Sequence, residues 1–320
     1  MFFRCLQGFI LPSISVFSPS VAVCVPTLNP GADFARWLGI VTASLPEATL
    51  LVVDSSSEDD TVSLARQVGA DTLVIPRQSF NHGATRDMAL RHLATSDVVV
   101  FLTQDAVPAD HQALATLVKA FENPQVGAAF GRQLPHNDAT PIAAHARLFN
   151  YPSVSRLVDA GDIPSLGIKT AFLSNSFAAY RRQALIEAGG FPHGTILSED
   201  MIAGARLLKA GWALAYQSDA CVYHSHNYTL LEEAKRYFDI GVLHSREPLL
   251  LRSLGKPEGE GWRFVNSEIR YLWRHAPFSL PEAALRTLVK YMGYRLGRME
   301  RRLPVWLKRR LSMHASYWSL

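Results

Sequence analysis

Two carboxylates close apolar runs of the sequence. Asp105 follows the run VVVFL at 98–102, and Asp54 ends the run TLLVV at 49–53. Ligands of open α/β sheets bind beyond the carboxyl ends of the strands, so residues at such positions are candidates for chemistry. A carboxylate at Asp54 could accept hydrogen bonds from the edge of a nucleobase. What the single acid at Asp105 does is not decided by the residues alone.

A second set of residues could bind an anion. The stretch FNHGATRD puts Gly83 at the start of the helical pattern at 84–94, with Arg86 one turn further on. The N–H groups and dipole of a helix N-terminus favour negative charge, and an arginine can add a charge-assisted bond to a phosphate. Taken singly, a glycine before a helix is more often a turn residue and an arginine is more often solvated, so both interpretations stay open.

Acids and histidines later in the chain have ordinary explanations as well. Glu199 and Asp200 open a helical pattern, where acids are expected merely for the helix dipole. His224 and His226 follow a predicted strand and would point to the same side of an extended chain. A structural histidine is the commoner explanation for either one alone.

The elements that must position these residues alternate along the chain. Strands are predicted at 21–26, 49–55, 71–76 and 97–105, then at 126–131, 175–180 and 213–223, and helices at 34–44, 61–69, 84–94 and 200–210. Such alternation predicts an α/β protein with a mostly parallel sheet flanked by helices. In the turn after the second strand, Ser56 fits a helix-start residue.

Composition limits the architecture. A chain of 320 residues with 48% hydrophobic and 19% charged residues is globular, and it is long enough for one substantial domain with an appendage or for two small domains. Three scattered cysteines suggest neither a disulfide framework nor a zinc site, which makes a reducing cytoplasm the default. No run is long enough for a transmembrane helix. We expect an ill-defined leader at 1–20, a main domain at 21–228 and a helical region at 229–320 with a Gly/Pro-rich break at 255–261.

The helical region ends in a basic tail. From Arg270 onward there are eleven basic and two acidic residues, a net charge of +9 that leaves −5 for the first 269 residues. Between Pro281 and Trp306 arginines interleave with leucine, methionine and tyrosine, which predicts a basic amphipathic helix suited to an anionic membrane surface. Packing on the main domain or on a second subunit, as in a homodimer, is the alternative.

Seven motifs together resemble a known family, the family 2 glycosyltransferases of the GT-A fold, and within it bacterial rhamnosyltransferases that use dTDP-L-rhamnose. They are CVPTLNPG, VVDSSSEDDT, FNHGATRD, FLTQDAVP, NSFAAYRR, the triplet Ser198-Glu199-Asp200, and HSHNYT. Positions 21 to about 229 carry them, roughly two thirds of the chain. The resemblance implies a Rossmann-like GT-A catalytic domain at 21–228 with a basic helical C-terminal extension.

The resemblance also implies a metal site. Asp105 would be the acidic ligand that holds Mg²⁺ or Mn²⁺ against the donor diphosphate, because Thr103 and Gln104 replace the acids that other members offer. One carboxylate is compatible with Mg²⁺, which is usually bound by one or two carboxylates and substrate phosphates. His224 and His226 lie where related enzymes often supply an additional ligand.

The remaining roles follow from the same resemblance. Pro26, Thr27, Asn29 and Asp54 would line the nucleoside pocket, with Ser56, Gly83, Arg86 and Gln104 completing the donor site. Asn175 and Ser176 would lie near the acceptor. Asp200, beside Glu199, would be the general base of an inverting transfer to a lipid-linked glycan, by an enzyme on the cytoplasmic face of the membrane.

Rival functions remain to be compared. A UDP- or GDP-sugar could replace the dTDP donor. A nucleotide-sugar pyrophosphorylase should carry a glycine-rich basic loop after the first strand, where this chain has PTLNPG. The basic tail alone would suit nucleic acid, but no nucleic-acid-binding motif is visible, so nucleic acid is not an expected partner. The depleted acidic cluster also leaves room for an inactive scaffold.

Overall fold

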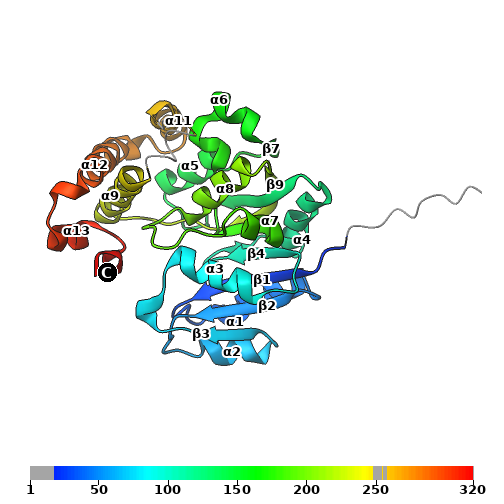
Figure 1. The fold of residues 1–320 in the computed structure, drawn as a ribbon. Helices are drawn as coiled ribbons and strands as arrows, with labels where there is room; N and C mark the ends of the chain where they lie inside the picture. Colours follow the sequence, from blue (N-terminus) through cyan, green and yellow to red (C-terminus); the bar gives the residue numbers. More distant parts are fainter. Residues whose placement is uncertain (1–17, 248–253, 255–257, 320) are drawn as a thin grey trace, which may run out of the picture.

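One nine-stranded sheet organises the molecule (Figure 1). The computed structural model describes residues 18–247, 254 and 258–319, so most of the predicted leader and the first part of the break at 255–261 lie outside the described residues. The strands are β1 (Val21–Thr27), β2 (Thr49–Asp54), β3 (Asp71–Val74), β4 (Val98–Leu102), β5 (Val107–Pro108), β6 (Val126–Leu134), β7 (Arg156–Val158), β8 (Phe177–Arg181) and β9 (Ala213–Tyr223). Their order is β3-β2-β1-β4-β8-β6-β9-β5, and β7 pairs with β9.

The sheet is parallel in its first half and mixed in its second. β3, β2, β1 and β4 pair in parallel, as does β6 with β9, whereas β8 runs antiparallel to both β4 and β6. The chain enters β8 from the segment at 174–176, which therefore lies at the edge where β4 ends. This reversal brings a loop of the second half against the strand ends of the first half.

Helices cover both faces of the sheet. The fully buried strand β4 shows why its sequence has no polar alternation, since Val99 and Phe101 enter one hydrophobic core and Val98, Val100 and Leu102 enter the other. The helices near the sheet are α1 (Phe34–Ser44), α2 (Thr61–Gln67), α3 (His82–His92), α4 (Ala113–Val118), α5 (Pro141–Asn150), α6 (Ile163–Leu166), α7 (Arg182–Glu187) and α8 (Glu199–Lys209). The α/β expectation is confirmed, and each predicted strand and helix has a counterpart.

The C-terminal region is helical, as expected, and lies away from β2 and β3 (Figure 1). It contains α9 (Leu230–Arg246), α11 (Glu258–His275), α12 (Leu280–Arg298) and α13 (Val305–Leu311). Glycines let α9 and α12 touch along their backbones, because a Cβ atom on Gly297 would lie 2.0 Å from the Phe238 carbonyl oxygen. Among residues 18–247 and 258–319, no helix is long and apolar enough to cross a membrane.

The basic stretch at 281–306 is two helices rather than the single one predicted. α12 ends at Arg298, a 3-10 turn covers Glu300–Arg302, and α13 begins after Pro304. Proline lacks a backbone N–H and restricts the residue before it, so it starts a helix more readily than it continues one. The chain therefore changes direction before Trp306.

Candidate active site

Hydrogen bonds join the turns that follow β1 and β2. The fully buried carboxylate of Asp54 accepts from Thr27 Oγ1 at 2.9 Å, from the Ser57 backbone N–H at 2.8 Å and from Ser57 Oγ at 2.6 Å. In this arrangement Asp54 has no exposed edge for a nucleobase. Its carboxylate instead holds together the ends of β1 and β2, and the Thr27 hydroxyl is engaged in the same hydrogen bond.

The Gln104 side chain also forms hydrogen bonds with the backbone. Its side-chain amide accepts from the Leu28 N–H at 2.8 Å and donates to the Leu28 carbonyl at 3.2 Å, which pins the end of β4 to the end of β1. Gln104, which the resemblance assigned to the donor site, therefore makes a structural contact here. On the same rim Pro26 is partly exposed, and Asn29 and Ser56 are exposed. Asn29 Oδ1 accepts from the Glu58 N–H, and Ser56 Oγ donates to the Ile75 carbonyl, each at 2.8 Å.

Asp105, His224 and His226 meet at the end of β4. Their nearest ligand atoms all lie within 4.8 Å of one another, and Asp105 Oδ2 is 3.4 Å from His224 Nε2 and 3.7 Å from His226 Nε2. β5 places the three together, because Val107 pairs with Tyr223 and so brings the turn after β4 beside the end of β9. Partial burial opposes ionisation of Asp105, but the hydrogen bond and charge of a protonated His224 hold the pKa of the carboxyl well below its usual range.

A second layer of contacts orients His224. Gln133 Nε2 donates to Ser174 Oγ at 2.8 Å, and Gln133 Oε1 accepts from Arg147 at 2.6 Å and faces His224 Nδ1 at 2.9 Å. Since Oε1 can only accept, we assign the proton of a neutral His224 to Nδ1, which turns the Nε2 lone pair toward Asp105. A lone pair facing a carboxylate oxygen is favourable only with a cation or a proton between them.

The three side chains therefore fit a divalent cation. A ligating histidine commonly donates its other ring N–H to an acceptor, as His224 does to Gln133. Burial and the neighbouring His224 lower the pKa of His226 to about 4, which keeps its ring neutral and able to ligate near pH 7. Asp105 is half exposed, so one side of the cluster remains open to a substrate.

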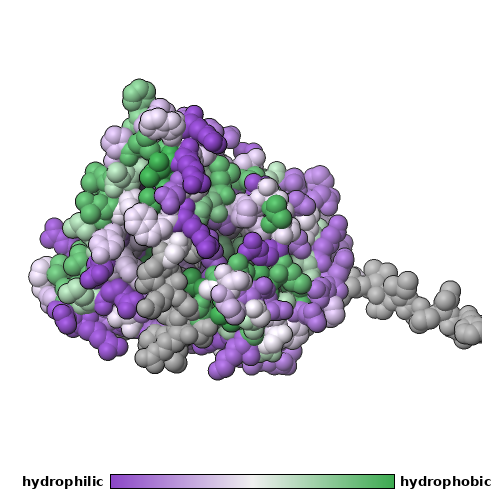
Figure 2. Space-filling model, turned by 90° about the horizontal axis from the view of Figure 1, so that it is seen from above, coloured by the Kyte–Doolittle hydropathy of each residue, from purple (hydrophilic) through white to green (hydrophobic). Residues whose placement is uncertain are grey.

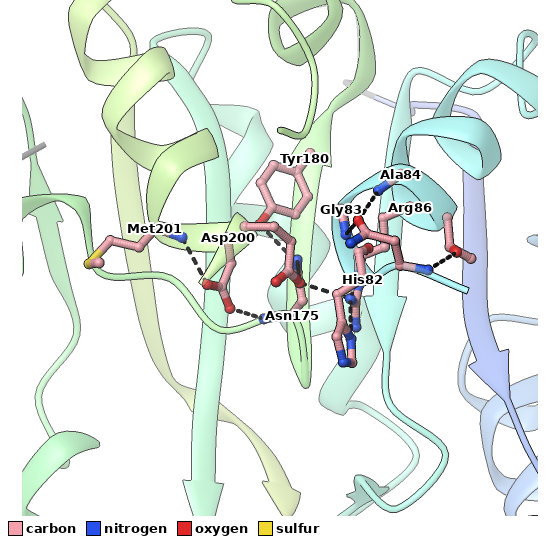
Figure 3. Close-up of polar contacts among 11 residues, drawn as sticks. His82, Gly83, Ala84, Arg86, Asn175, Tyr180, Asp200 and Met201 are labelled. Atoms are coloured by element: carbon pink, nitrogen blue, oxygen red, sulfur yellow. Dashed lines mark hydrogen bonds and ion pairs between the residues drawn. The ribbon is translucent and has the colours of Figure 1, made fainter. Parts of the chain in front are cut away.

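Arg86 and Glu199 form a buried ion pair between α3 and α8 (Figure 3). Their side chains are 3% and 8% exposed, and Arg86 Nη1 lies 2.8 Å from Glu199 Oε1, which also accepts from Asn175 Nδ2 at 3.0 Å. Burial alone would raise the pKa of Glu199, but the charge of Arg86 brings it below the usual value. The guanidinium is thus held away from any phosphate, contrary to the sequence expectation, and Glu199 positions its neighbours.

Gly83 also lies where α3 packs against the segment that leads into α8. A Cβ atom there would lie 1.9 Å from the Pro192 carbonyl oxygen, so only glycine lets α3 approach the backbone of the segment before α8 this closely. The Asn81 side chain already caps the helix, accepting from the N–H groups of Gly83 and Ala84. The predicted anion site at this N-terminus is absent from the described structure for that reason.

Asp200 is held differently from Glu199. Asp200 Oδ2 accepts from the Asn175 N–H at 3.1 Å and Oδ1 from the Met201 N–H at 2.8 Å, while the side chain remains partly exposed. Burial and the negative charge of Glu199 raise the pKa of Asp200 to about 7. A carboxylate with this pKa can accept a proton at neutral pH.

One segment connects Asp200 to the histidine cluster. Ser174 receives the hydrogen bond from the Gln133 amide that orients His224, and Asn175 binds both Glu199 and Asp200. The next residue, Ser176, accepts from the Thr103 N–H two residues before Asp105, at 3.4 Å. Asn175 is 2% exposed, so it organises the site rather than lining an acceptor pocket.

Sequence reasoning missed Gln133, Arg147 and Ser174. Gln133 lies near the end of β6, and the strand-end rule that selected Asp105 would have selected it too. Sequence alone gives no sign that Arg147, on α5, reaches the Gln133 carboxamide.

The end of the chain also reaches this site. Asp239 on α9 accepts from the Met313 N–H at 2.9 Å, and the His314 ring packs edge-on against His82 with centroids 5.4 Å apart. His82 in turn contacts Arg86, with 3.3 Å between His82 Nδ1 and Arg86 Nη1. The C-terminal segment is thus built into the surroundings of the ion pair.

Comparison with known proteins assigns this α/β fold to a family. The model of the glycosyl transferase family 2 matches residues 22–189, and the chain belongs to this family of glycosyltransferases. It is 46% identical over 301 residues to the O-antigen chain rhamnosyltransferase RfbN of Salmonella typhimurium, covering 93% of this chain and 96% of the relative. With the O-antigen chain rhamnosyltransferase WbaN of Salmonella anatum the identity is 47% over 303 residues, covering 94% and 96%.

Solved structures share the fold. The mannosyltransferase PcManGT from Pyrobaculum calidifontis, in complex with GDP-Man and Mn²⁺, is 20% identical with a TM-score of 0.56, covering 92% of this chain and 85% of that one. Residues 1–349 of S. aureus TarS are 14% identical with a TM-score of 0.54, covering 94% and 88%. The GT-A expectation is confirmed, including the helical C-terminal region.

The buried ion pair generates a prediction about stability. Replacing Arg86 by alanine leaves Glu199 charged and without its cation, which should lower the free energy of unfolding by about 3–5 kcal/mol. The matched control is Arg91→Ala, because Arg91 pairs with Asp87 on the same helix but is 57% exposed, and its loss should cost at most about 1 kcal/mol. Urea denaturation compares the two variants, and equal losses would show that the Arg86 pair does not hold α3 and α8 together.

Proposed function

We propose that this protein is an inverting, metal-dependent rhamnosyltransferase that moves L-rhamnose from dTDP-L-rhamnose to a hydroxyl of a growing O-antigen chain. One observation supports this reaction class. The same edge of the sheet holds both a possible cation site, formed by Asp105, His224 and His226, and a partly exposed carboxylate with a raised pKa, Asp200. The choice of sugar rests on the two rhamnosyltransferases that match nearly the whole chain.

In this proposal Asp105, His224 and His226 hold the cation. Mg²⁺ prefers oxygen ligands, so two imidazole nitrogens favour a transition metal such as Mn²⁺. When bound, the cation supplies positive charge that stabilises the leaving diphosphate. Pro26, Asn29 and Ser56 line the accessible rim over β1 and β2, where the nucleoside is expected to bind.

Asp200 acts as the general base. Its carboxylate takes the proton of the acceptor hydroxyl while that oxygen attacks the anomeric carbon, and the bond from that carbon to the diphosphate oxygen breaks with its electron pair on the diphosphate. Attack from the side opposite the leaving group inverts the anomeric configuration. Glu199 and Arg86 contribute by holding α8, and with it Asp200, in place.

The donor site is tested by titration calorimetry with dTDP, UDP and GDP, each with and without Mn²⁺. We expect metal-dependent binding that is strongest for dTDP and that is lost in Asp105→Ala and weakened about tenfold or more in His224→Ala, because each removes a ligand. Asp71→Asn, an exposed acid on β3, should bind as wild type does. Tighter binding of UDP or GDP would replace the donor, and no nucleotide binding by folded protein would refute the transferase proposal.

The raised pKa of Asp200 predicts a pH profile. The carboxyl can accept a proton only when ionised, so transfer should increase as the pH rises through about 7 and level off above it. Asp200→Asn should reduce turnover by about 10²–10⁴-fold while Mn²⁺-dependent dTDP binding persists. The exposed Asp219→Asn on β9 provides the control, and an unchanged rate in Asp200→Asn would rule out this base.

We further propose that the C-terminal helices bind the anionic cytoplasmic face of the cell membrane. α12 exposes Leu285, Leu288, Met292 and Leu296, Met299 is exposed just after it, and α11 exposes Trp262, Ile269 and Trp273. Eight of the eleven basic tail residues are exposed, whereas Arg286, Lys290 and Lys308 pair with buried glutamates. Hydrophobic and hydrophilic surfaces alternate on the side of the molecule where these helices lie (Figure 2).

Sedimentation with vesicles tests this surface. Wild type should bind vesicles that contain phosphatidylglycerol, not pure phosphatidylcholine, and high salt should release it, since each basic residue near an anionic surface contributes about 1 kcal/mol. Leu288→Glu should weaken binding, whereas Val154→Glu, at an exposed apolar position near the sheet, should not. If wild type instead binds no vesicles but forms a salt-resistant dimer that Leu288→Glu dissociates, the exposed apolar residues of α11 and α12 contact a second copy of the chain.

A further inference from the structure

A polar cavity opens beside the histidine cluster. It has a volume of about 530 Å³ and is lined by His136, Asp138, His226, Asn227, Tyr228 and Glu232, among others. His226 belongs both to this cavity and to the proposed cation site. The loops that form it follow β6 and β9, on the side of the sheet away from β1 and β2.

The walls of the cavity are fixed by hydrogen bonds between its two loops. The His136 N–H donates to Ser225 Oγ at 3.0 Å, the Thr140 N–H donates to Asn227 Oδ1 at 2.9 Å, and Asn227 Nδ2 donates to the Asp138 carbonyl at 3.0 Å. Because these bonds hold the two loops to each other, binding need not order them, which lowers its entropic cost.

An aromatic face lies next to carboxylates in this cavity. The Tyr228 ring stacks on His226 with centroids 5.1 Å apart and planes 29° apart, and the Arg236 guanidinium lies 5.7 Å from the Tyr228 ring centre. Asp138 is exposed at the cavity, and its carboxylate can accept hydrogen bonds from hydroxyl groups. A pyranose offers both an apolar C–H face and donor hydroxyls, so it complements this pair.

The charge of this cavity disfavours the diphosphate of the donor. Asp138 and Glu232 would repel a diphosphate, whereas a neutral sugar meets no such penalty. The sheet order separates this cavity from the nucleoside rim over β1 and β2, with the cation site between them. The cavity therefore lies on the acceptor side.

We propose that this cavity binds the terminal pyranose of the acceptor glycan, with the Tyr228 ring as an apolar contact in its wall and Asp138 as its hydroxyl acceptor. This inference rests on the proposed transferase function and adds to it the residues that select the acceptor. The donor nucleotide does not enter the cavity.

The test uses the full chain with alkyl hexopyranosides as acceptor probes, in wild type, Tyr228→Ala, Tyr228→Phe and Asp138→Asn. Transfer kinetics should show the acceptor KM raised about tenfold in Tyr228→Ala and Asp138→Asn, the effect of one lost contact. Tyr228→Phe keeps the ring and should stay near wild type. Donor hydrolysis without acceptor and Mn²⁺-dependent dTDP binding should be unchanged in Tyr228→Phe and Asp138→Asn, which keep the ring that stacks on His226.

Two results would overturn the proposal. One is an unchanged acceptor KM in both Tyr228→Ala and Asp138→Asn, and the other is a raised donor KM, which would assign the cavity to the donor sugar. Wild type that binds Mn²⁺ and dTDP but no pyranoside refutes this subsite alone, whereas wild type that binds no nucleotide refutes the transferase function together with it. Asp71→Asn controls for loss of an exposed carboxylate elsewhere.

Discussion

The site depends on one buried ion pair, between Arg86 on α3 and Glu199 on α8. Two charges with almost no access to water must be compensated by each other and by hydrogen bonds, so their geometry has little freedom. Asn175 supplies such a bond, and its backbone N–H binds Asp200. The constraint on Glu199 thus becomes a constraint on the neighbouring residue, which is the proposed base.

The segment Ser174-Asn175-Ser176 extends this constraint across the sheet edge. Ser174 accepts a hydrogen bond from Gln133, which orients His224, and Ser176 accepts one from Thr103, two residues before Asp105. A base and a cation site that act on the two sides of one sugar carbon must keep a fixed separation. A rigid segment bound to both provides it, and the antiparallel strand β8 is what brings that segment to the edge.

Strand-end reasoning selected residues that the structure brings to one edge of the sheet. Asp105, His224 and His226 have ligand atoms within 4.8 Å of one another, with His224 buried and the other two at least partly exposed, and Asp200 is partly exposed at the start of α8. Asp54, Gln104 and Arg86 lie in the same region, but their polar groups are bound to Thr27, Leu28 and Glu199. A polar residue after a strand can bind a ligand or bind the next turn, and both uses favour the same residue types.

The sequence by itself determined the alternation of strands and helices, the polar strand ends and the basic helical tail, because hydrophobic periodicity and charge are local properties of the chain. Only the tertiary structure decided that β8 runs antiparallel, that α12 and α13 are separate, and which polar groups remain unpaired. Pairing depends on distances between residues far apart in the chain, such as the 113 positions between Arg86 and Glu199. Burying a charge costs free energy unless a partner compensates it, and this selection of partners operates only once the chain has packed.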